Sequence, residues 1–170
     1  IDGLRVTDAA TMDAARDVFI GENIKLVEAV RAEGVEADGI VAGVIEADYL
    51  DKEKYGYVGE PTNVRLGMLR SIVNSGAVPI LTCLGIAPGG QLLNINGDSA
   101  TRAVVAALQP LKVIFLTGTG GLLDKHKRLM HSINLASDYE KLMKADWVNG
   151  GMRLKLAEIK KLLDALPLTS

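Results

Sequence analysis

The sequence contains little of what disulfide-rich, metal-binding or membrane-spanning proteins need. Its 170 residues include 1 cysteine and 2 histidines, which excludes a disulfide within the chain and a cysteine-cluster metal site. Cys83 lies inside an apolar run, so we expect a buried, unreactive thiol. His126 and His131 lie in a charged stretch without ligand spacing, and we expect both to face solvent. No apolar run approaches the ~20 residues that span a bilayer.

Neither sign of charge dominates. The chain has 19 Lys and Arg against 21 Asp and Glu, a formal net charge of −2. This balance gives no general attraction to nucleic acid or to anionic membranes, and we expect neither as a partner. An anionic ligand must instead be held by a few placed cations and backbone amides. With 48% hydrophobic and 24% charged residues, the composition is typical of a soluble globular domain with its own core.

Helix and strand signals alternate along the chain. Thr7 or Asp8 is predicted to cap a first helix, which Gly21 interrupts or re-caps and Gly34 ends. Later helices are predicted from Pro61 to Asn74, after Asp98, from Asp138 with Ser137 as cap, and from Met152 to Leu166. Strands are predicted at 39–45, 78–84, 91–95 and 111–116. This order predicts an α/β fold, a three-layer sandwich with a mostly parallel central sheet.

The most informative stretch follows the turn at Pro88-Gly89-Gly90. Asn94, Asn96 and Asp98 alternate, so in extended backbone their side chains leave the same face. Asp98 is also the predicted N-cap of the next helix. Two amides and a carboxylate at a helix start suit the binding of a polar ligand. A capped loop, in which these side chains only satisfy their own backbone, remains the alternative on the residues alone.

Two further features suit an anionic ligand. The glycine-rich loop from Thr117 to Gly121 follows an apolar run, and its backbone N–H groups suit a phosphate. It has neither the P-loop sequence nor the dinucleotide fingerprint. Lys155 is predicted in the first turn of the last helix, where a cation is unfavourable against the helix dipole. Either it is held for an anion or it is an exposed residue of a lysine-rich helix.

LLNINGD at 92–98 resembles the LxNxNAD signature of the N-acetylglutamate kinases, in the amino acid kinase family. Four other segments agree in the same order: GLRVTD at 3–8, ADYLDKEKYGYVGE at 47–60, LTGTGGLLD at 116–124 and GGMRLKL at 150–156. The resemblance is strongest to fungal acetylglutamate kinases and to acetylglutamate synthases that carry the same domain. It implies an amino acid kinase fold over 1–166 that lacks its N-terminal portion. Residues 167–170 would then begin a linker to an acetyltransferase-type domain.

The resemblance also implies roles for individual residues. Lys155, in the MxxK pattern, would contact the transferring phosphoryl group, and Asp98 would hold other catalytic groups in position. N-acetyl-L-glutamate would be bound by Arg5, Asn94 and Asn96. ATP would be bound by Thr117, Gly120 and Gly121, with Mg²⁺ carried on its phosphates and no metal ligand from the protein.

Some features depart from the family pattern. The family's first glycine-rich loop, with its catalytic lysine, precedes Ile1. We therefore expect an excerpt of a longer protein that is inactive alone. LTGTGG lacks the Ser-Asp of ordinary bacterial kinases, Gly97 replaces an alanine, and Thr101-Arg102 differ as well.

Three hypotheses follow. The first is an acetylglutamate kinase of arginine biosynthesis, either fungal-type or the kinase part of a bifunctional synthase/kinase. The second is a non-catalytic, arginine-binding regulatory domain of an N-acetylglutamate synthase. The third is an unrelated nucleotide-binding α/β module. The resemblance further implies arginine as feedback inhibitor, a homo-oligomer, and a cytoplasmic location in a bacterium or the mitochondrial matrix in a eukaryote.

Overall fold

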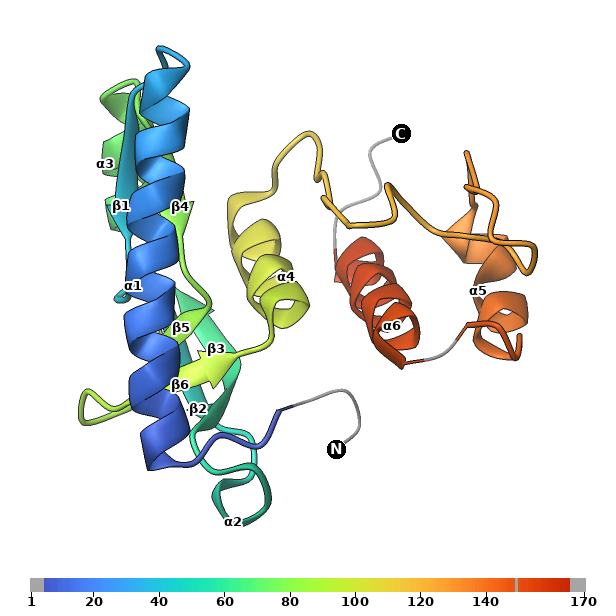
Figure 1. Cartoon of the computed structure of the whole chain (residues 1–170), viewed down its shortest axis with the longest axis horizontal. Coiled ribbons are helices and arrows are strands. Elements are labelled where there is room, and N and C mark those ends of the chain that lie inside the picture. Colours follow the sequence, from blue (N-terminus) through green and yellow to red (C-terminus); the bar gives the residue numbers. More distant parts are fainter. Residues whose placement is uncertain (1–4, 149, 166–170) are drawn as a thin grey trace. The chain divides into compact units, whose positions relative to one another are not determined.

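The computed structural model describes residues 5–148 and 150–165, which form two compact units divided between Leu108 and Gln109 (Figure 1). The first unit contains α1 (Ala9–Ala32), β1 (Ala37–Ile40), β2 (Ile45–Tyr49), α2 (Lys52–Tyr55), β3 (Val58–Val64), α3 (Leu66–Asn74), β4 (Val78–Leu81), β5 (Leu84–Ile86), β6 (Leu92–Ile95) and α4 (Gly97–Leu108). The second contains α5 (Leu135–Met143) and α6 (Gly150–Ala165). The predicted linker at 167–170 lies outside the described residues.

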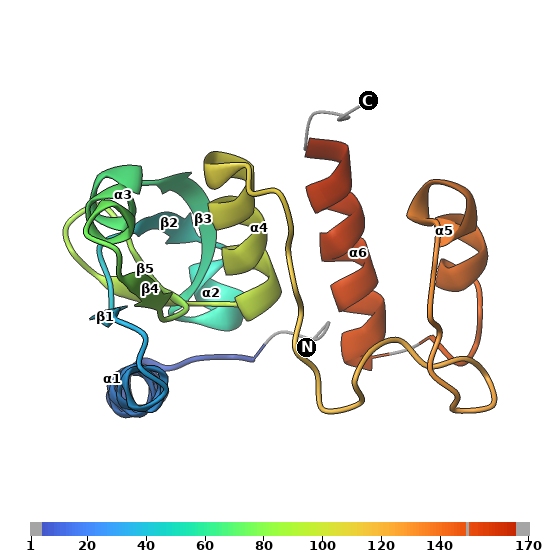
Figure 2. The same cartoon turned by 90° about the horizontal axis from the view of Figure 1, so that it is seen from above.

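The first unit combines parallel and antiparallel strand pairs. β1 and β4 pair in parallel, from Ala37 opposite Val78 to Ile40 opposite Leu81, and α1 and α3 lie on opposite sides of this pair (Figures 1 and 2). β2, β3, β6 and β5 close into a small barrel with two parallel and two antiparallel pairings. The predicted α/β class is confirmed, and the antiparallel pairs add the barrel to it.

The barrel is packed too tightly for side chains at two of its positions. A Cβ at Gly85 would lie 2.4 Å from Cδ1 of Ile95, and one at Gly59 would lie 2.9 Å from Cβ of Leu93. The surrounding core is made of buried apolar residues, Ile40, Val44, Ile45, Ala47, Leu69, Ala87, Leu93, Ile95 and Ala100. This packing fixes β6, the strand that carries Asn94.

Helix α1 begins and ends as the sequence predicts. The Asp8 carboxylate accepts a hydrogen bond from the Thr11 N–H at 2.7 Å, and Gly34 follows the helix at φ +79°. The predicted interruption at Gly21 is wrong, because α1 continues through it. A mid-helix glycine costs about 1 kcal/mol, but the turn after Gly21 is anchored where the Asn23 amide donates to the Ile80 carbonyl at 2.8 Å.

Two other predicted boundaries are also wrong. Pro61 does not begin a helix but lies within β3, where the register against β2 shifts beside Ala47. Irregular pairing of this kind tolerates a residue that lacks a backbone N–H. The apolar run at 78–84 divides into β4 and β5, because the chain turns at Thr82, whose hydroxyl donates to the Val41 carbonyl. The run at 39–45 likewise contributes to two strands, β1 and β2.

The second unit differs most from the sequence prediction. The apolar stretch 111–116 is not a strand, and Leu111, Ile114 and Leu116 are exposed. Its apolar composition is that of a buried strand, but among the described residues it pairs with no strand. The core of this unit forms elsewhere, around Leu142, Val148 and Leu156.

The helix starts in this unit also differ from expectation. Asn134, not Ser137, caps α5, accepting hydrogen bonds from the N–H groups of Ala136 and Ser137. Because α6 begins at Gly150, Lys155 lies in its second turn, and the dipole argument for its placement does not hold. Among residues 5–148 and 150–165, no helix is both long and apolar enough to cross a membrane.

Candidate active site

The first unit holds a cavity of about 520 Å³ beside the N-terminal half of α1. We call it the Arg5 cavity. Its polar lining is Arg5, Thr7, Thr11, Asn94 and Asn96, and α1 supplies an apolar wall between Ala14 and Phe19. The three residues predicted to bind substrate, Arg5, Asn94 and Asn96, are therefore brought together here. A concave site with an apolar wall and a few convergent polar groups is the usual form of a small-molecule site.

Thr7 links two of these residues. Its side chain is fully buried, and its hydroxyl donates to the Arg5 carbonyl at 3.3 Å and accepts from Nδ2 of Asn94 at 3.2 Å. The sequence suggested Thr7 only as a possible helix cap, and Asp8 takes that position. A polar residue of an apolar segment, two positions from a predicted ligand residue, is the signal that could have indicated this role.

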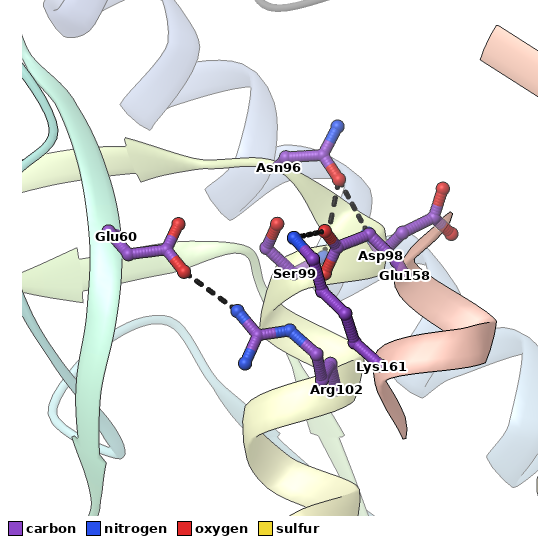
Figure 3. A network of polar contacts seen from close by, with 7 residues as sticks. All are labelled: Glu60, Asn96, Asp98, Ser99, Arg102, Glu158 and Lys161. Carbon is purple, nitrogen blue, oxygen red and sulfur yellow. Dashed lines mark hydrogen bonds and ion pairs between the residues drawn. The ribbon is translucent and has the colours of Figure 1, made fainter. Parts of the chain in front are cut away.

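Asn96 both lines the Arg5 cavity and caps α4. Its Oδ1 accepts from the N–H groups of Asp98 at 3.0 Å and Ser99 at 3.2 Å (Figure 3). The prediction that Asp98 is the N-cap is therefore wrong, because α4 begins at Gly97 and Asp98 lies in its first turn. The helix dipole favours a carboxylate there. The sequence left open whether these side chains bind a ligand or only cap their own backbone. Asn96 fits both descriptions, because it accepts from backbone N–H groups and also lines the Arg5 cavity.

An ion pair ties α4 to the barrel one turn after Asp98. The Arg102 guanidinium lies 2.7 Å from Oε1 of Glu60 on β3 (Figure 3), and the Arg102 side chain is only 24% exposed. Asp98 and Arg102 are four residues apart, which places them on one side of the helix. The sequence had distinguished Arg102 only as a departure from the family pattern.

Cys83 lies close to the same helix start. It is half-buried, and burial raises the pKa of its thiol, with the negative charge of Asp98 adding to the effect. Both causes favour the neutral thiol over the nucleophilic thiolate. His126 and His131 are exposed, as predicted.

The second unit holds a cavity of about 280 Å³, which we call the Lys155 cavity. It is lined by Phe115, Thr117, Thr119, Gly121, Leu122, Gly151, Met152, Lys155 and Ile159. Thr117 and Gly121, predicted to bind nucleotide, thus share a cavity with Lys155. Gly120 lies in the same turn but not in the lining. The Lys155 ammonium lies 5.1 Å from the centre of the Phe115 ring, within the range of a cation–π interaction.

The glycine-rich loop is a closed turn. The Gly120 N–H donates to the Thr117 carbonyl at 3.1 Å, and the Thr119 hydroxyl donates to the Gly121 carbonyl at 2.8 Å. Gly120 and Gly121 have φ of +75° and +156°, which favour glycine. Backbone without side chains next to an ammonium group suits a phosphate.

A second turn follows the loop and is held by Asp124. Its carboxylate accepts from the N–H groups of Arg128 at 2.9 Å and His126 at 2.8 Å. The hydrogen bond from the Arg128 backbone is the main reason why the pKa of Asp124 is lowered. The described residues contain no group of three or more His, Cys, Asp or Glu side chains placed to hold a metal ion.

The comparison with known families defines the class of protein. The model of the amino acid kinase family matches residues 2–166, and the chain belongs to this family.

Individual relatives narrow the comparison. The chain is 49% identical over 170 residues to the acetylglutamate kinase of Xanthomonas campestris pv. campestris, covering 100% of this chain and 40% of that protein. It is 46% identical over 169 residues to the mitochondrial protein arg-6 of Neurospora crassa, covering 99% of this chain and 19% of that protein. It therefore spans about 40% of the length of the first of these relatives.

Two crystal structures are similar to the structure of this chain. One, of a Streptococcus mutans protein, is 33% identical with a TM-score of 0.85, over 97% of this chain and 68% of that one. The other is the N-acetylglutamate synthase of Neisseria gonorrhoeae in complex with coenzyme A and N-acetyl-glutamate. It has a TM-score of 0.84 at 20% identity, over 97% of this chain and 38% of that one. At that identity the likeness shows the fold alone.

Proposed function

We propose that the chain is the kinase part of a fungal-type acetylglutamate kinase or of a bifunctional N-acetylglutamate synthase/kinase. Such an enzyme uses ATP to phosphorylate the side-chain carboxylate of N-acetyl-L-glutamate in arginine biosynthesis. The observation that carries the proposal is the Arg5 cavity, which Arg5 lines together with Asn94 and Asn96 from the end of β6, against an apolar wall. This combination complements a small acylated amino acid with negative charge.

In this proposal each predicted site residue of the first unit has a role. Arg5 binds a carboxylate of the substrate, because the planar guanidinium matches the two carboxylate oxygens. Asn94 and Asn96 bind its remaining polar groups. Asp98 accepts hydrogen bonds that hold other catalytic groups in position.

In this proposal the Lys155 cavity binds the nucleotide phosphates and the transferring phosphoryl group. Phosphoryl transfer needs alignment and neutralisation of the charge that spreads over the oxygens of the transferring group. Lys155 supplies positive charge, while Thr117, Gly120 and Gly121 give the nucleotide phosphates close backbone approach. Mg²⁺ bound together with ATP would supply further positive charge to neutralise the phosphates beside these residues.

A second candidate is a non-catalytic, arginine-binding regulatory domain of an N-acetylglutamate synthase. The likeness in fold to the Neisseria gonorrhoeae synthase favours it. Retention of Arg5, Asn94, Asp98 and Lys155 together favours the kinase, because a domain without catalysis has no chemical need for all four. Under either candidate, arginine is the proposed feedback ligand and a homo-oligomer the proposed assembly. The proposed compartment is the cytoplasm of a bacterium or the mitochondrial matrix of a eukaryote.

The test is a hydroxamate assay on the full-length protein. It receives ATP, Mg²⁺, N-acetyl-L-glutamate and hydroxylamine, which traps the acyl phosphate. Lys155→Ala should lower the rate about 10²-fold or more, because it removes a charge that stabilises the transition state. Lys160→Ala is the matched control, since Lys160 lies on the same helix and pairs with Asp164.

The outcome separates the two candidates. Hydroxamate that falls in Lys155→Ala but not in Lys160→Ala supports the kinase. Absence of hydroxamate, from a protein that binds arginine and makes acetylglutamate from acetyl-CoA, would overturn the kinase proposal in favour of the regulatory domain.

A further inference from the structure

We infer that Thr7 is a positioning residue that makes the Arg5 cavity select ligands carrying an N–H group. Its hydroxyl orients the Asn94 amide so that the carbonyl oxygen, and not the NH₂ group, faces the ligand. The inference rests on the proposed function for the identity of the substrate, but the orientation of Asn94 follows from the hydrogen bonds alone.

The direction of each hydrogen bond is fixed by the chemistry of its partners. A threonine hydroxyl has one hydrogen to donate, and that hydrogen points to the Arg5 carbonyl, which can only accept. The hydroxyl must therefore accept from Asn94, and the atom of Asn94 that lies 3.2 Å away is the donor Nδ2. The Oδ1 of Asn94 is left for the cavity.

Both ends of this contact are held by backbone. The Thr7 N–H donates to the Tyr55 carbonyl at 2.9 Å, and the Thr7 carbonyl accepts from the Tyr57 N–H at 2.7 Å. The Asn94 N–H donates to the Tyr57 carbonyl at 2.8 Å, so Thr7 and Asn94 both bond to the same residue. The Thr7 side chain is fully buried, so its hydroxyl depends on these protein partners for its hydrogen bonds.

Asn96 has the opposite polarity. Its Oδ1 is used by the N–H groups of Asp98 and Ser99, which leaves its NH₂ group as donor. The Arg5 cavity thus combines a cation, an amide donor at Asn96 and an amide acceptor at Asn94. An N-acylated amino acid matches all three, because its carboxylates and acyl oxygen accept while its amide N–H donates. An O-acylated analogue of the same shape leaves the Asn94 oxygen facing another oxygen.

The test compares two substrates in the hydroxamate assay of the full-length protein. N-acetyl-L-glutamate is set against 2-acetoxyglutarate of the same configuration, in which an ester oxygen replaces the N–H. The ratio of their kcat/KM values reports on this single contact. We expect the native protein to prefer the amide by about 10-fold or more, because the ester leaves the Asn94 acceptor unpaired.

The variants assign this preference to Thr7. Thr7→Val has nearly the same shape without the hydroxyl, so the amide of Asn94 is free to turn over, and the preference should fall towards unity. Thr7→Ser keeps the hydroxyl and should restore it. Thr82→Val is the matched control, because it also removes a hydroxyl bonded to a backbone carbonyl but lies outside the Arg5 cavity, and it should keep the preference.

Each outcome decides a different statement. No preference in the native protein, or an unchanged preference in a Thr7→Val variant whose thermal unfolding shows it folded, would overturn the inference. If Thr7→Val does not fold, the preference of the native protein and of Asn94→Ala, in which it should vanish, still tests the contact. If no protein yields hydroxamate, the kinase proposal fails, and calorimetric binding of the two ligands to the same variants tests Thr7 separately.

Discussion

The ammonium group of Lys155 lies over the face of the Phe115 ring, 5.1 Å from its centre. The two residues come from different segments of the second unit, and both line the Lys155 cavity. A lysine side chain has many rotamers, and an aromatic face restricts where its charge rests. The ring therefore holds the cation at the cavity wall, where the proposed reaction needs it.

Phe115→Leu should lower kcat about 2- to 30-fold, the range that corresponds to a cation–π contribution of roughly 0.5–2 kcal/mol. Phe115→Trp, which keeps an aromatic face, should retain more activity. Tyr139→Leu is the control, because it removes a ring that lies 5.9 Å from the ammonium of Lys160 on the same helix. Steady-state kinetics with N-acetyl-L-glutamate measure these effects, and equal losses in Phe115→Leu and Tyr139→Leu would contradict the role of Phe115.

The two roles of Asn96 separate on substitution. Asn96→Ala should lower the free energy of unfolding by about 1 kcal/mol, because α4 loses its cap, and should raise KM for N-acetyl-L-glutamate. Asn96→Asp keeps a capping oxygen but loses the NH₂ donor, so it should raise KM with little loss of stability. Asn134→Ala removes the corresponding cap of α5 and should cost about as much stability without changing KM. Urea unfolding and kinetics on the three variants provide the comparison.

The backbone at position 56 requires a glycine. It has φ of +70°, and a Cβ there would lie 2.2 Å from the Thr7 carbonyl oxygen. Gly56→Ala should lower the free energy of unfolding by about 1–3 kcal/mol and raise KM, because Thr7 must move. Gly67→Ala, in α3 with nothing within 4 Å of the added Cβ, should be neutral or stabilising by up to about 1 kcal/mol. A thermal melt that ranks the two variants the other way would contradict this reading of Gly56.

The raised pKa of Cys83 predicts slow alkylation. The folded protein holds the thiol proton more tightly than the unfolded chain does, so iodoacetamide should modify Cys83 more slowly at pH 8–9 than after unfolding in urea. By the same linkage, this group's contribution to stability is fully present below the pKa of the unfolded thiol. It is lost as the pH rises above that value. Asp98→Asn removes one of the two causes and should speed alkylation of the folded protein; an unchanged rate would show that burial alone acts.

The sequence predicts local features of this chain well. The cap at Asp8 and the terminator at Gly34 identify α1 correctly, because caps and helix-ending glycines depend on neighbouring backbone only. Asn94 and Asn96, predicted from their spacing to leave the same face, both line the Arg5 cavity, whereas Asp98, the third residue of that alternation, does not.

Features that depend on distant segments are not predicted. Pro61 signals a helix start by itself, but β2 pairs with its segment and makes it a strand. The hydroxyl of Thr7 looks like a cap until Asn94 is placed beside it. Residues 111–116 have the composition of a buried strand, yet a strand also needs a neighbouring strand, and no local pattern reveals whether one is present.

The exposed stretch from Leu111 to Leu116 has a consequence for handling the protein. It combines β-branched, aromatic and aliphatic residues without proline, the composition that drives pairing between chains. Lys112 is the one charged residue of this stretch, and Pro110 immediately precedes the stretch. A charge and a proline both oppose the pairing of strands between chains, so these two residues protect the stretch against aggregation. Replacing Lys112 with an apolar residue would remove the charge that keeps neighbouring molecules apart at high concentration.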